Sequence, residues 1–426
     1  MRNFVFNAAT ALTVAAISLQ AQQTQPLTLQ ECIRLAESVP SSVSLARQER
    51  DIAARELTQA RAGFLPQSRF VNGFTYNSPL PNSREAFSFV TANGIREYSS
   101  LLSVNQEFDT TGRLRADMAR ARVAQDITAA GLALTQRDLR RAVTLAYYRA
   151  LLTRRIVRVL EDGLTESQSF EKRSKLLLEG GEAAQADVVK ASAQVAFLQQ
   201  ARNAAEMEAN LANQELASFW TRDVADTLPL ADLFEDTPQP PESETIKATP
   251  FLKRLEFNLL EAQKRGFQAD ARRARSALMP QLGVAFQYGI DSTAVRIRDR
   301  GYAASVNLNI PIFDWHKARA ATEQARLKAQ QVDTSRAISE RTFSKEYHSA
   351  LTRVKQLYEQ IALTRRQAGL AEDDLRLSRI RYEGGEGIAL DVVTAQNQLA
   401  QARSNYYTTM ANYLNAKADL EVATGR

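Results

Sequence analysis

Apolar residues recur at helical spacing along both halves of the chain. In the second half they return every seven positions, at Val392, Leu399, Tyr406, Tyr413 and Leu420. Small residues fill the companion positions, at Ala395, Ala402, Thr409 and Ala416. In the first half a similar stripe runs through Val188, Ala191, Val195, Leu198, Ala205, Ala212, Leu216 and Phe219. A seven-residue repeat is typical of coiled packing, and small residues at the seam let neighbouring helices approach closely.

A much longer helical stretch precedes each of these seams. Residues 112–178 and residues 316–382 contain no proline, and each stretch covers 67 positions. Because proline is the strongest interruption of a helix, both stretches can form unbroken helices. At 1.5 Å per residue each would measure about 100 Å, which is longer than a compact domain needs. The sequence therefore predicts two antiparallel hairpins, each with a long helix and a returning one.

A glycine pair stands where each long helix would reverse. The two stretches are "LLEGGEAAQADVVKAS" at 177–192 and "RYEGGEGIALDVVTAQ" at 381–396, and the paired glycines are Gly180, Gly181, Gly384 and Gly385. A glycine-rich loop before a helix can also bind phosphate. However, neither stretch has the lysine followed by serine or threonine of a P-loop. We therefore predict hairpin tips at residues 179–186 and 383–390.

Period-two alternation marks four strands, in pairs at about 68–107 and about 282–310. In "LGVAFQYGI", Leu282, Val284, Phe286, Tyr288 and Ile290 share one face, and small or polar residues occupy the other. Alternation of this kind predicts strands with one apolar face. The strands have the length of transmembrane β-strands, although a soluble sheet packed on a helix would alternate in the same way.

The same order of elements occurs twice. Each half begins with a helix that ends at a related proline signature, "ARAGFLPQ" at 60–67 and "ARSALMPQ" at 274–281, because proline disfavours helix in the residue before it. We expect a signal peptide at 1–21, a first repeat at 22–225, an acidic proline-rich linker at 226–249 and a second repeat at 250–426. The signal-peptide prediction rests on the apolar run that follows Arg2.

Composition excludes several classes of function. The net charge is +6, but acidic and basic residues are interspersed, so we predict no nucleic-acid partner. The chain has one cysteine, Cys32, which we interpret as a small core residue. It has two histidines, His316 and His348, which we interpret as structural or solvated. With no paired metal ligands and no catalytic constellation, we expect neither an enzyme nor a bound cofactor.

These features together resemble the TolC family of bacterial outer-membrane efflux proteins. The residues that carry the resemblance are the Leu65-Pro66-Gln67 and Met279-Pro280-Gln281 signatures, the strand pairs after them, and the two glycine tips with Asp187-Val188-Val189 and Asp391-Val392-Val393. "LTLQECIRLA" at 27–36 and "ANYLNAKADLEVATG" at 411–425 also look like that family. The order and duplication of the motifs are more specific than any one of them.

The resemblance implies an α+β, mainly α architecture. Three protomers would each give four strands to a 12-stranded outer-membrane β-barrel, and their helices would form an α-helical barrel across the periplasm. The protein would be an outer-membrane exit duct for efflux or type I secretion. Its partners would be a periplasmic adaptor, an inner-membrane transporter of the RND, ABC or MFS type, and outer-membrane lipid. The alternative from another class is a soluble periplasmic coiled-coil adaptor, which normally has only one hairpin.

The resemblance also suggests a gate at the hairpin tips. Asp391 matches a family position that can face the pore, where a ring of carboxylates would attract cations. Alternatively, Asp187 and Asp391 only stabilise helix starts, where negative charge meets the positive end of the helix dipole. Tyr382 matches a tyrosine of the family's closing network, whereas Gly387 stands where an arginine is expected. Four glutamates either add negative charge at the tip or are simply solvated: Glu179, Glu182, Glu383 and Glu386.

Overall fold

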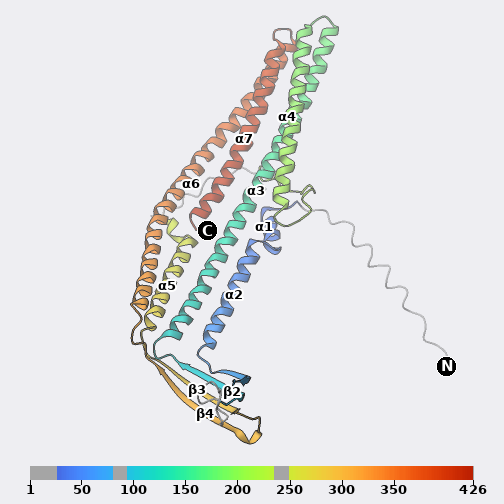
Figure 1. Cartoon of the computed structure of the whole chain (residues 1–426). Helices are drawn as coiled ribbons and strands as arrows, with labels where there is room; N and C mark the ends of the chain where they lie inside the picture. Colours follow the sequence, from blue (N-terminus) through green and yellow to red (C-terminus); the bar gives the residue numbers. More distant parts are fainter. Residues whose placement is uncertain (1–25, 80–93, 235–248, 426) are drawn as a thin grey trace, which may run out of the picture.

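The computed structural model describes residues 26–79, 94–234 and 249–425, and Figure 1 shows a long, narrow molecule with helices above a small sheet. In chain order its elements are α1 (Leu29–Ser38), α2 (Ser42–Ala62), β1 (Gln67–Tyr76), β2 (Arg96–Phe108), α3 (Arg113–Glu179), α4 (Gln185–Ala217), the 3-10 turn η1 (Pro250–Lys253), α5 (Leu255–Ser276), β3 (Gln281–Ser292), the 3-10 turn η2 (Ile297–Asp299), β4 (Arg300–Asn309), α6 (Lys317–Glu383) and α7 (Ala389–Ala423). The expected signal peptide lies outside the described residues, as do residues 235–248 of the expected linker.

The two long helices, α3 and α6, run from the sheet to the far tip (Figure 1). Each has 67 residues, as the sequence predicted. Near the tip α3 packs against α4 and α6 packs against α7. Near the sheet, α2 and α5 flank α3, and α5 also packs against α6. In the described part of the chain, no helix combines the length and the apolar character of a membrane span.

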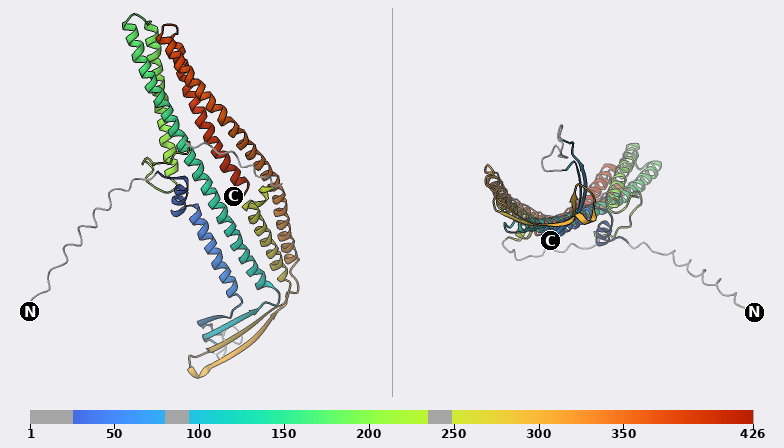
Figure 2. Two further views of the ribbon diagram at one scale, coloured as in Figure 1. Left: turned by 180° about the vertical axis from the view of Figure 1, so that it is seen from behind. Right: turned by 60° about the horizontal axis from the view of Figure 1, so that its bottom comes forward.

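The returning helix α7 packs through the predicted seam. Val392, Ala395, Ala402 and Tyr413 are all buried. The small side chains let α7 approach its neighbours closely, and the larger residues between them fill the remaining space. Figure 2 shows that the helices form a curved wall and that the sheet continues it. The mainly helical fold with two hairpins is therefore confirmed.

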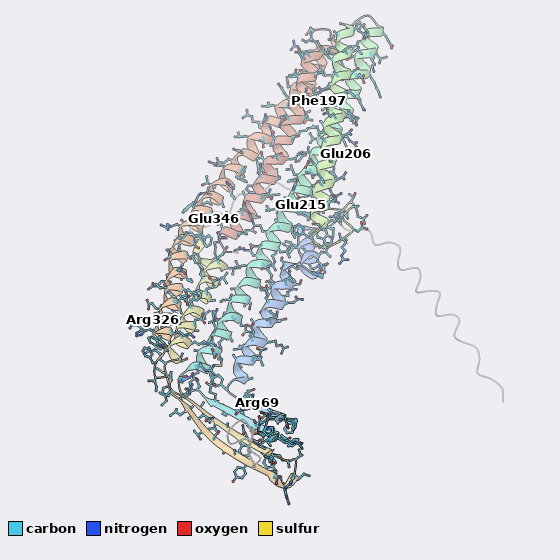
Figure 3. All side chains as sticks on the ribbon, in the orientation of Figure 1. Arg69, Phe197, Glu206, Glu215, Arg326 and Glu346 are labelled. Atoms are coloured by element: carbon cyan, nitrogen blue, oxygen red, sulfur yellow. The ribbon has the colours of Figure 1, made fainter. Side chains whose placement is uncertain are left out.

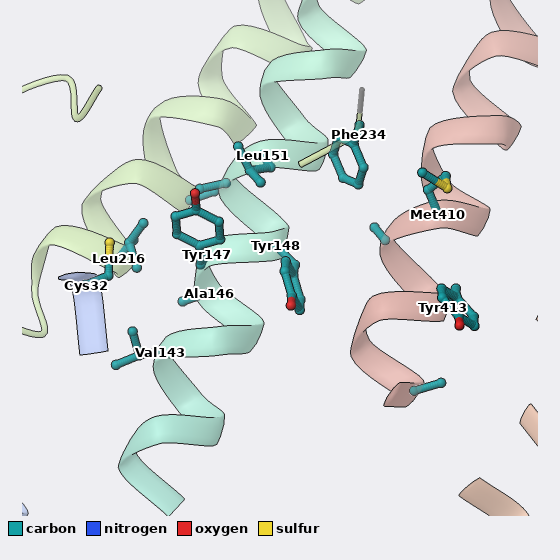
Figure 4. Packing of buried hydrophobic residues seen from close by; sticks show 14 of the residues in the cluster. Cys32, Val143, Ala146, Tyr147, Tyr148, Leu151, Leu216, Phe234, Met410 and Tyr413 are labelled. Atoms are coloured by element: carbon teal, nitrogen blue, oxygen red, sulfur yellow. The ribbon is translucent and has the colours of Figure 1, made fainter. Parts of the chain in front are cut away.

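The largest apolar cluster lies midway along the molecule, where α1, α3, α4 and α7 meet (Figure 4). Tyr147 is fully buried there, and its hydroxyl lies 3.1 Å and 2.8 Å from the carbonyl oxygens of Leu27 and Ala231. Residues 226–234 of the expected linker thus form a belt held against the helices. Cys32 is completely buried in the same cluster, and burial raises the pKa of its thiol to about 11. Its predicted role as a core residue is confirmed.

The four strands form one antiparallel sheet in the order β1-β2-β3-β4. The register places apolar residues of all four strands on one face, with Phe70, Leu102, Tyr288 and Tyr302 in a single row across it. No described residue outside the sheet covers this face, and large side chains on it are exposed. β1 and β4 are the edge strands of the sheet, and each has one strand partner in the described part of the chain. The predicted alternation is confirmed, but none of the described helices packs on the apolar face.

One glycine in the sheet is required by a close backbone approach. A Cβ atom on Gly289 of β3 would lie 2.0 Å from the carbonyl oxygen of Ser100 in β2. Gly301 is its cross-strand partner in β4, and a Cβ there would meet nothing within 4 Å. The two positions form a matched pair for testing strand packing.

We expect Gly289→Ala to loosen the β2–β3 pairing, because the added carbon forces the two backbones apart. An overpacked site of this kind costs about 1–3 kcal/mol. Hydrogen exchange of the β2 and β3 amides in the full chain should therefore accelerate by about tenfold. Gly301→Ala is the control and should leave exchange unchanged; equal exchange in the two variants would contradict the prediction.

Candidate functional site

The two hairpin tips have the same backbone geometry. The first glycine of each pair, Gly180 or Gly384, caps the long helix with an ordinary backbone conformation. The second glycine of each pair has a positive φ, of 79° at Gly181 and 75° at Gly385, which residues with a side chain rarely adopt. Two equivalent backbone hydrogen bonds close each turn. In the first turn, the N–H groups of Gly181 and Glu182 donate to the carbonyl oxygens of Leu178 and Leu177 respectively. In the second turn, the N–H groups of Gly385 and Glu386 donate to the carbonyl oxygens of Tyr382 and Arg381 respectively. This is the Schellman motif, so the glycines end one helix and reverse the chain.

The two aspartates occupy equivalent positions but have different surroundings. Each is the third residue of its returning helix, where a carboxylate interacts favourably with the helix dipole. Asp187 is partly buried and lies 3.9 Å from the ammonium group of Lys190. Asp391 is exposed and has no ion pair among the described residues. Both can stabilise a helix start, and only Asp391 presents an uncompensated charge.

Tyr382 lies at the contact between the two hairpins. It is 7% exposed, and its ring packs edge-on against Phe170 of α3 with the ring centroids 5.1 Å apart. Its hydroxyl donates to Ser174 Oγ at 3.3 Å. Around this pair the hairpins share an apolar cluster to which Ala191, Leu375, Ala389, Val392, Ala395 and Leu399 also belong. We refer to this cluster, with Phe170 and Tyr382, as the tip cluster.

Polar contacts join the hairpins around the tip cluster. Arg379 of α6 forms an ion pair with Glu166 of α3. Gln194 of α4 and Asn397 of α7 exchange two amide hydrogen bonds, of 2.6 Å and 3.3 Å. The four predicted tip glutamates are all exposed: Glu179, Glu182, Glu383 and Glu386. Of these, Glu383 lies 3.9 Å from the guanidinium group of Arg173 on α3. Polar contacts between the hairpins thus surround the apolar tip cluster.

A polar cavity of about 580 Å³ separates the hairpins on the sheet side of the tip cluster. Asp162, Glu166, Arg379 and Arg403 are among the residues that line it. Gln396 also lines it; it is 4% exposed, and neither its amide nitrogen nor its oxygen has a partner among the described residues. A buried amide normally forms hydrogen bonds, so this cavity is polar enough to hold water.

Gly387 fills the position where the resemblance implies an arginine. A Cβ there would lie 3.1 Å from the backbone nitrogen of Tyr382 and 3.2 Å from the carbonyl carbon of Arg381. The site is tight for any side chain. The residues that contact Tyr382 instead are Phe170 and Ser174, and sequence reasoning missed both. No local motif marks them, because each looks like an ordinary helix residue.

Metal-ligating side chains are not clustered in the residues that the structure describes. No group of three or more histidine, cysteine, aspartate or glutamate side chains is placed to hold a metal ion there. His316 forms the N-cap of α6 with a left-handed backbone, and His348 is exposed on the same helix. Both match the structural or solvated roles expected of them.

Comparison with known proteins identifies the family. A model of the outer membrane efflux protein family matches residues 32–221 and 253–426. The chain belongs to this family. Among curated proteins it is similar to nodulation protein T of Rhizobium leguminosarum bv. viciae, with 23% identity over 90% of this chain and 78% of that protein. It is also similar to a pyoverdine export outer membrane protein of Pseudomonas putida, with 21% identity over 77% of this chain and 70% of that protein.

Solved structures of outer-membrane channels have the same fold. The CmeC outer membrane channel of Campylobacter jejuni superposes with a TM-score of 0.82 at 16% sequence identity, over 100% of this chain and 94% of that one. The protein is thus an outer-membrane efflux duct with a large periplasmic helical portion, as the resemblance implied. Its family and fold are those of channel proteins and not of enzymes. Channels of the efflux protein family work with an adaptor and an inner-membrane pump.

We expect the Arg379–Glu166 ion pair to help hold the tip closed. Partly exposed ion pairs contribute about 0.2–1 kcal/mol each. Glu166→Gln should therefore raise the open probability of single channels in planar bilayers by up to about fivefold. The double exchange Glu166→Arg with Arg379→Glu should restore the closed state.

The control for this experiment is Glu206→Gln, which removes the same charge. Glu206 pairs with Arg202 at 2.5 Å within α4, so losing that pair leaves the contact between hairpins intact. Equal opening of Glu166→Gln and Glu206→Gln would show that the change of charge matters and that the ion pair between hairpins does not.

Proposed function

We propose that three copies of this chain form a closed duct whose tips act as its gate. The observation that carries the proposal is that the described part of one molecule has two edges along its length with no neighbouring element beyond them. One edge consists of β1, α2 and α4, and the other of β4 and α6. Because the edges differ, they join head to tail, and such a contact closes into a ring when its rotation allows. Twelve strands from three copies would leave no exposed sheet edge.

Apolar stripes along both edges support this assembly. On α6, Leu363, Leu370 and Leu377 recur every seven residues and are exposed. On the other edge, α2 exposes Leu45 and Ile52, seven residues apart. On α4, Val189, Phe197, Met207 and Leu211 are exposed on one helical stripe, and Phe197 is labelled in Figure 3. Seven-residue apolar repeats predict helical partners, and a neighbouring copy supplies them.

At the tip, we propose that Asp391 contributes to a ring of carboxylates around the threefold axis, with Glu383 and Glu386 nearby. Its exposure and its lack of an ion pair support this role, and the same carboxylate still stabilises the start of α7. Asp187, which has Lys190 beside it, then acts only at the start of its helix. Tyr382 keeps the two hairpins together behind the ring.

The tips are also the proposed docking surface for the adaptor. Gly180, Gly181, Gly384 and Gly385 shape two short turns at the end of the molecule farthest from the sheet (Figure 1). We propose that an adaptor there connects the duct to an inner-membrane transporter, which supplies the energy. The duct itself acts as a passive conduit and catalyses no reaction.

The assembly is tested by its mass and its location. The full chain should fractionate with outer membranes, and light scattering in detergent should give the mass of three copies. Leu370→Asp should yield single copies, because a carboxylate buried in an apolar seam without a partner costs about 2 kcal/mol or more. Arg365→Asp introduces an acid on another exposed face of α6 and should remain trimeric. A wild-type chain that is soluble without detergent would refute the duct.

The role of Asp391 is tested by ion selectivity. Asp391→Asn should lower the cation-to-anion permeability ratio in planar bilayers by about fivefold, since a carboxylate about 4 Å from a cation contributes about 1 kcal/mol in water. Asp187→Asn is the matched control and should leave the ratio unchanged. If both variants conduct as the wild type does, Asp391 serves only the helix start.

A further inference from the structure

The end of the helical wall next to the sheet carries exposed aromatic residues. Phe313 and Trp315 lie between β4 and α6, with their ring centroids 4.7 Å apart. Trp315 is 84% exposed, and Ile312 beside it is 95% exposed. These residues continue the apolar face of the sheet, which ends at Leu308 in β4. Aromatic side chains at such a boundary fit the interface between lipid tails and headgroups.

The backbone of this turn is strained at the tryptophan. Trp315 and His316 have φ angles of 53° and 63°, a region that bulky residues rarely adopt. The corresponding turn before α3 uses Gly112, which adopts this region without strain. An exposed tryptophan in a strained conformation indicates a role outside the packing of the single chain.

A groove close to this turn concentrates positive charge. It has a volume of about 390 Å³, lies between α5 and α6, and includes Arg272, Arg275 and Arg326 with no acidic residue in its lining. Arg272 and Arg275 have no ion pair among the described residues. In the same described part of the chain, Arg326 has one ion pair, with Glu323 at 3.6 Å, and both of these side chains are largely exposed. We call this groove, with its three arginines, the arginine groove.

The second groove along the α5–α6 seam shows that this imbalance is local. That groove contains Asp270, which pairs with Arg120 of α3 at 3.3 Å, and Arg273, which pairs with Asp117 at 2.6 Å. Arg113, which also lines that groove, pairs with Glu107, so of its basic side chains Lys328 alone has no ion pair in the described part of the chain. In the arginine groove three arginines line a concave surface that contains no acidic side chain, and one of them pairs with the exposed Glu323; this excess of positive charge favours binding of an external anion.

The position of the arginine groove relative to the sheet indicates which anion. Arg275 lies in the last turn of α5, a few residues before β3 begins at Gln281. Arg326 is the tenth residue of α6, about 15 Å from the helix start, and Figure 3 labels it at the sheet end of the wall. Lys317 and Arg319, nearer still to the sheet, are exposed and have no ion pair in the described part of the chain. Long basic side chains at this depth reach the headgroup layer of a bilayer.

We propose that the arginine groove binds the phosphate headgroup of an anionic phospholipid, while Phe313 and Trp315 lie among the headgroups beside it. The inference rests on the proposed function, because it needs the sheet to lie in the membrane. Guanidinium groups form paired hydrogen bonds with phosphate oxygens, and basic residues near a bilayer bind anionic lipids. The bound lipid would belong to the leaflet at the helical end of the sheet.

The test uses the full chain in detergent and measures lipid binding by native mass spectrometry. Short-chain phosphatidylglycerol should bind at least tenfold more tightly than phosphatidylcholine of the same chain length. The triple variant Arg272→Gln, Arg275→Gln, Arg326→Gln should lose this preference. The control is Arg353→Gln, Arg365→Gln, Arg366→Gln, which removes the same charge from exposed positions on α6 far from the sheet and should keep it.

A second measurement tests the aromatic turn. The chain has two tryptophans, so Trp220→Phe leaves Trp315 as the only one. In vesicles that contain phosphatidylglycerol, a quencher attached to the lipid headgroup should then reduce its fluorescence severalfold more than a water-soluble quencher does. A larger effect of the water-soluble quencher would remove Trp315 from the proposed site.

Three results would overturn the lipid site. They are equal binding of the two lipids, unchanged binding by the groove variant, and displacement of phosphatidylglycerol by an equal concentration of inorganic phosphate, which would indicate a site for soluble anions. A wild-type trimer in the outer membrane without lipid preference overturns this inference alone. A soluble or monomeric wild type instead overturns the proposed function.

Discussion

A helix of about 100 Å must bury an apolar stripe along its whole length, and the rest of the structure depends on this constraint. Among the described helices, none that packs against α3 or α6 is as long as they are. α4 has 33 residues and covers the tip half of α3, while α2, with 21 residues, covers the sheet half. In the same way, α7 covers the tip half of α6 and α5 covers its sheet half. The gap between the covering helices lies midway, where α1 and the belt of residues 226–234 complete the packing around Tyr147.

This constraint also explains which features could be predicted from the sequence. The long helices, the glycine reversals and the alternating strands each leave a local pattern, and all of them were predicted. The contacts between hairpins leave none, because Ser174 and Tyr382 lie 208 positions apart and either could face solvent. The resemblance indicated that Tyr382 takes part in closing the tip, but it did not identify Phe170 or Ser174. The arginine groove was missed for the same reason, since its residues come from two helices separated by the β3–β4 hairpin.

The two halves share a backbone design but differ in their chemistry. Asp187 has a lysine beside it, whereas its counterpart Asp391 is uncompensated. Gly112 takes the left-handed conformation before α3, whereas Trp315 and His316 take it before α6. In both cases the second half has a feature, an uncompensated carboxylate or a strained aromatic turn, that its counterpart in the first half lacks. The duplication therefore supplies the wall, and the two halves differ at positions that we propose to face partners.

The distribution of contacts also determines how such a duct can open. Within each hairpin the helices pack along a continuous apolar seam, and the Schellman turns fix the reversal. Between the hairpins the tip is held by one small apolar cluster, a few polar pairs and a polar cavity with an unsatisfied amide at Gln396. Separating two hairpins exposes much less apolar surface than unzipping either one, because the seams are long and the tip cluster is short. Opening should therefore move each hairpin as a rigid body and break the contacts around Tyr382 first.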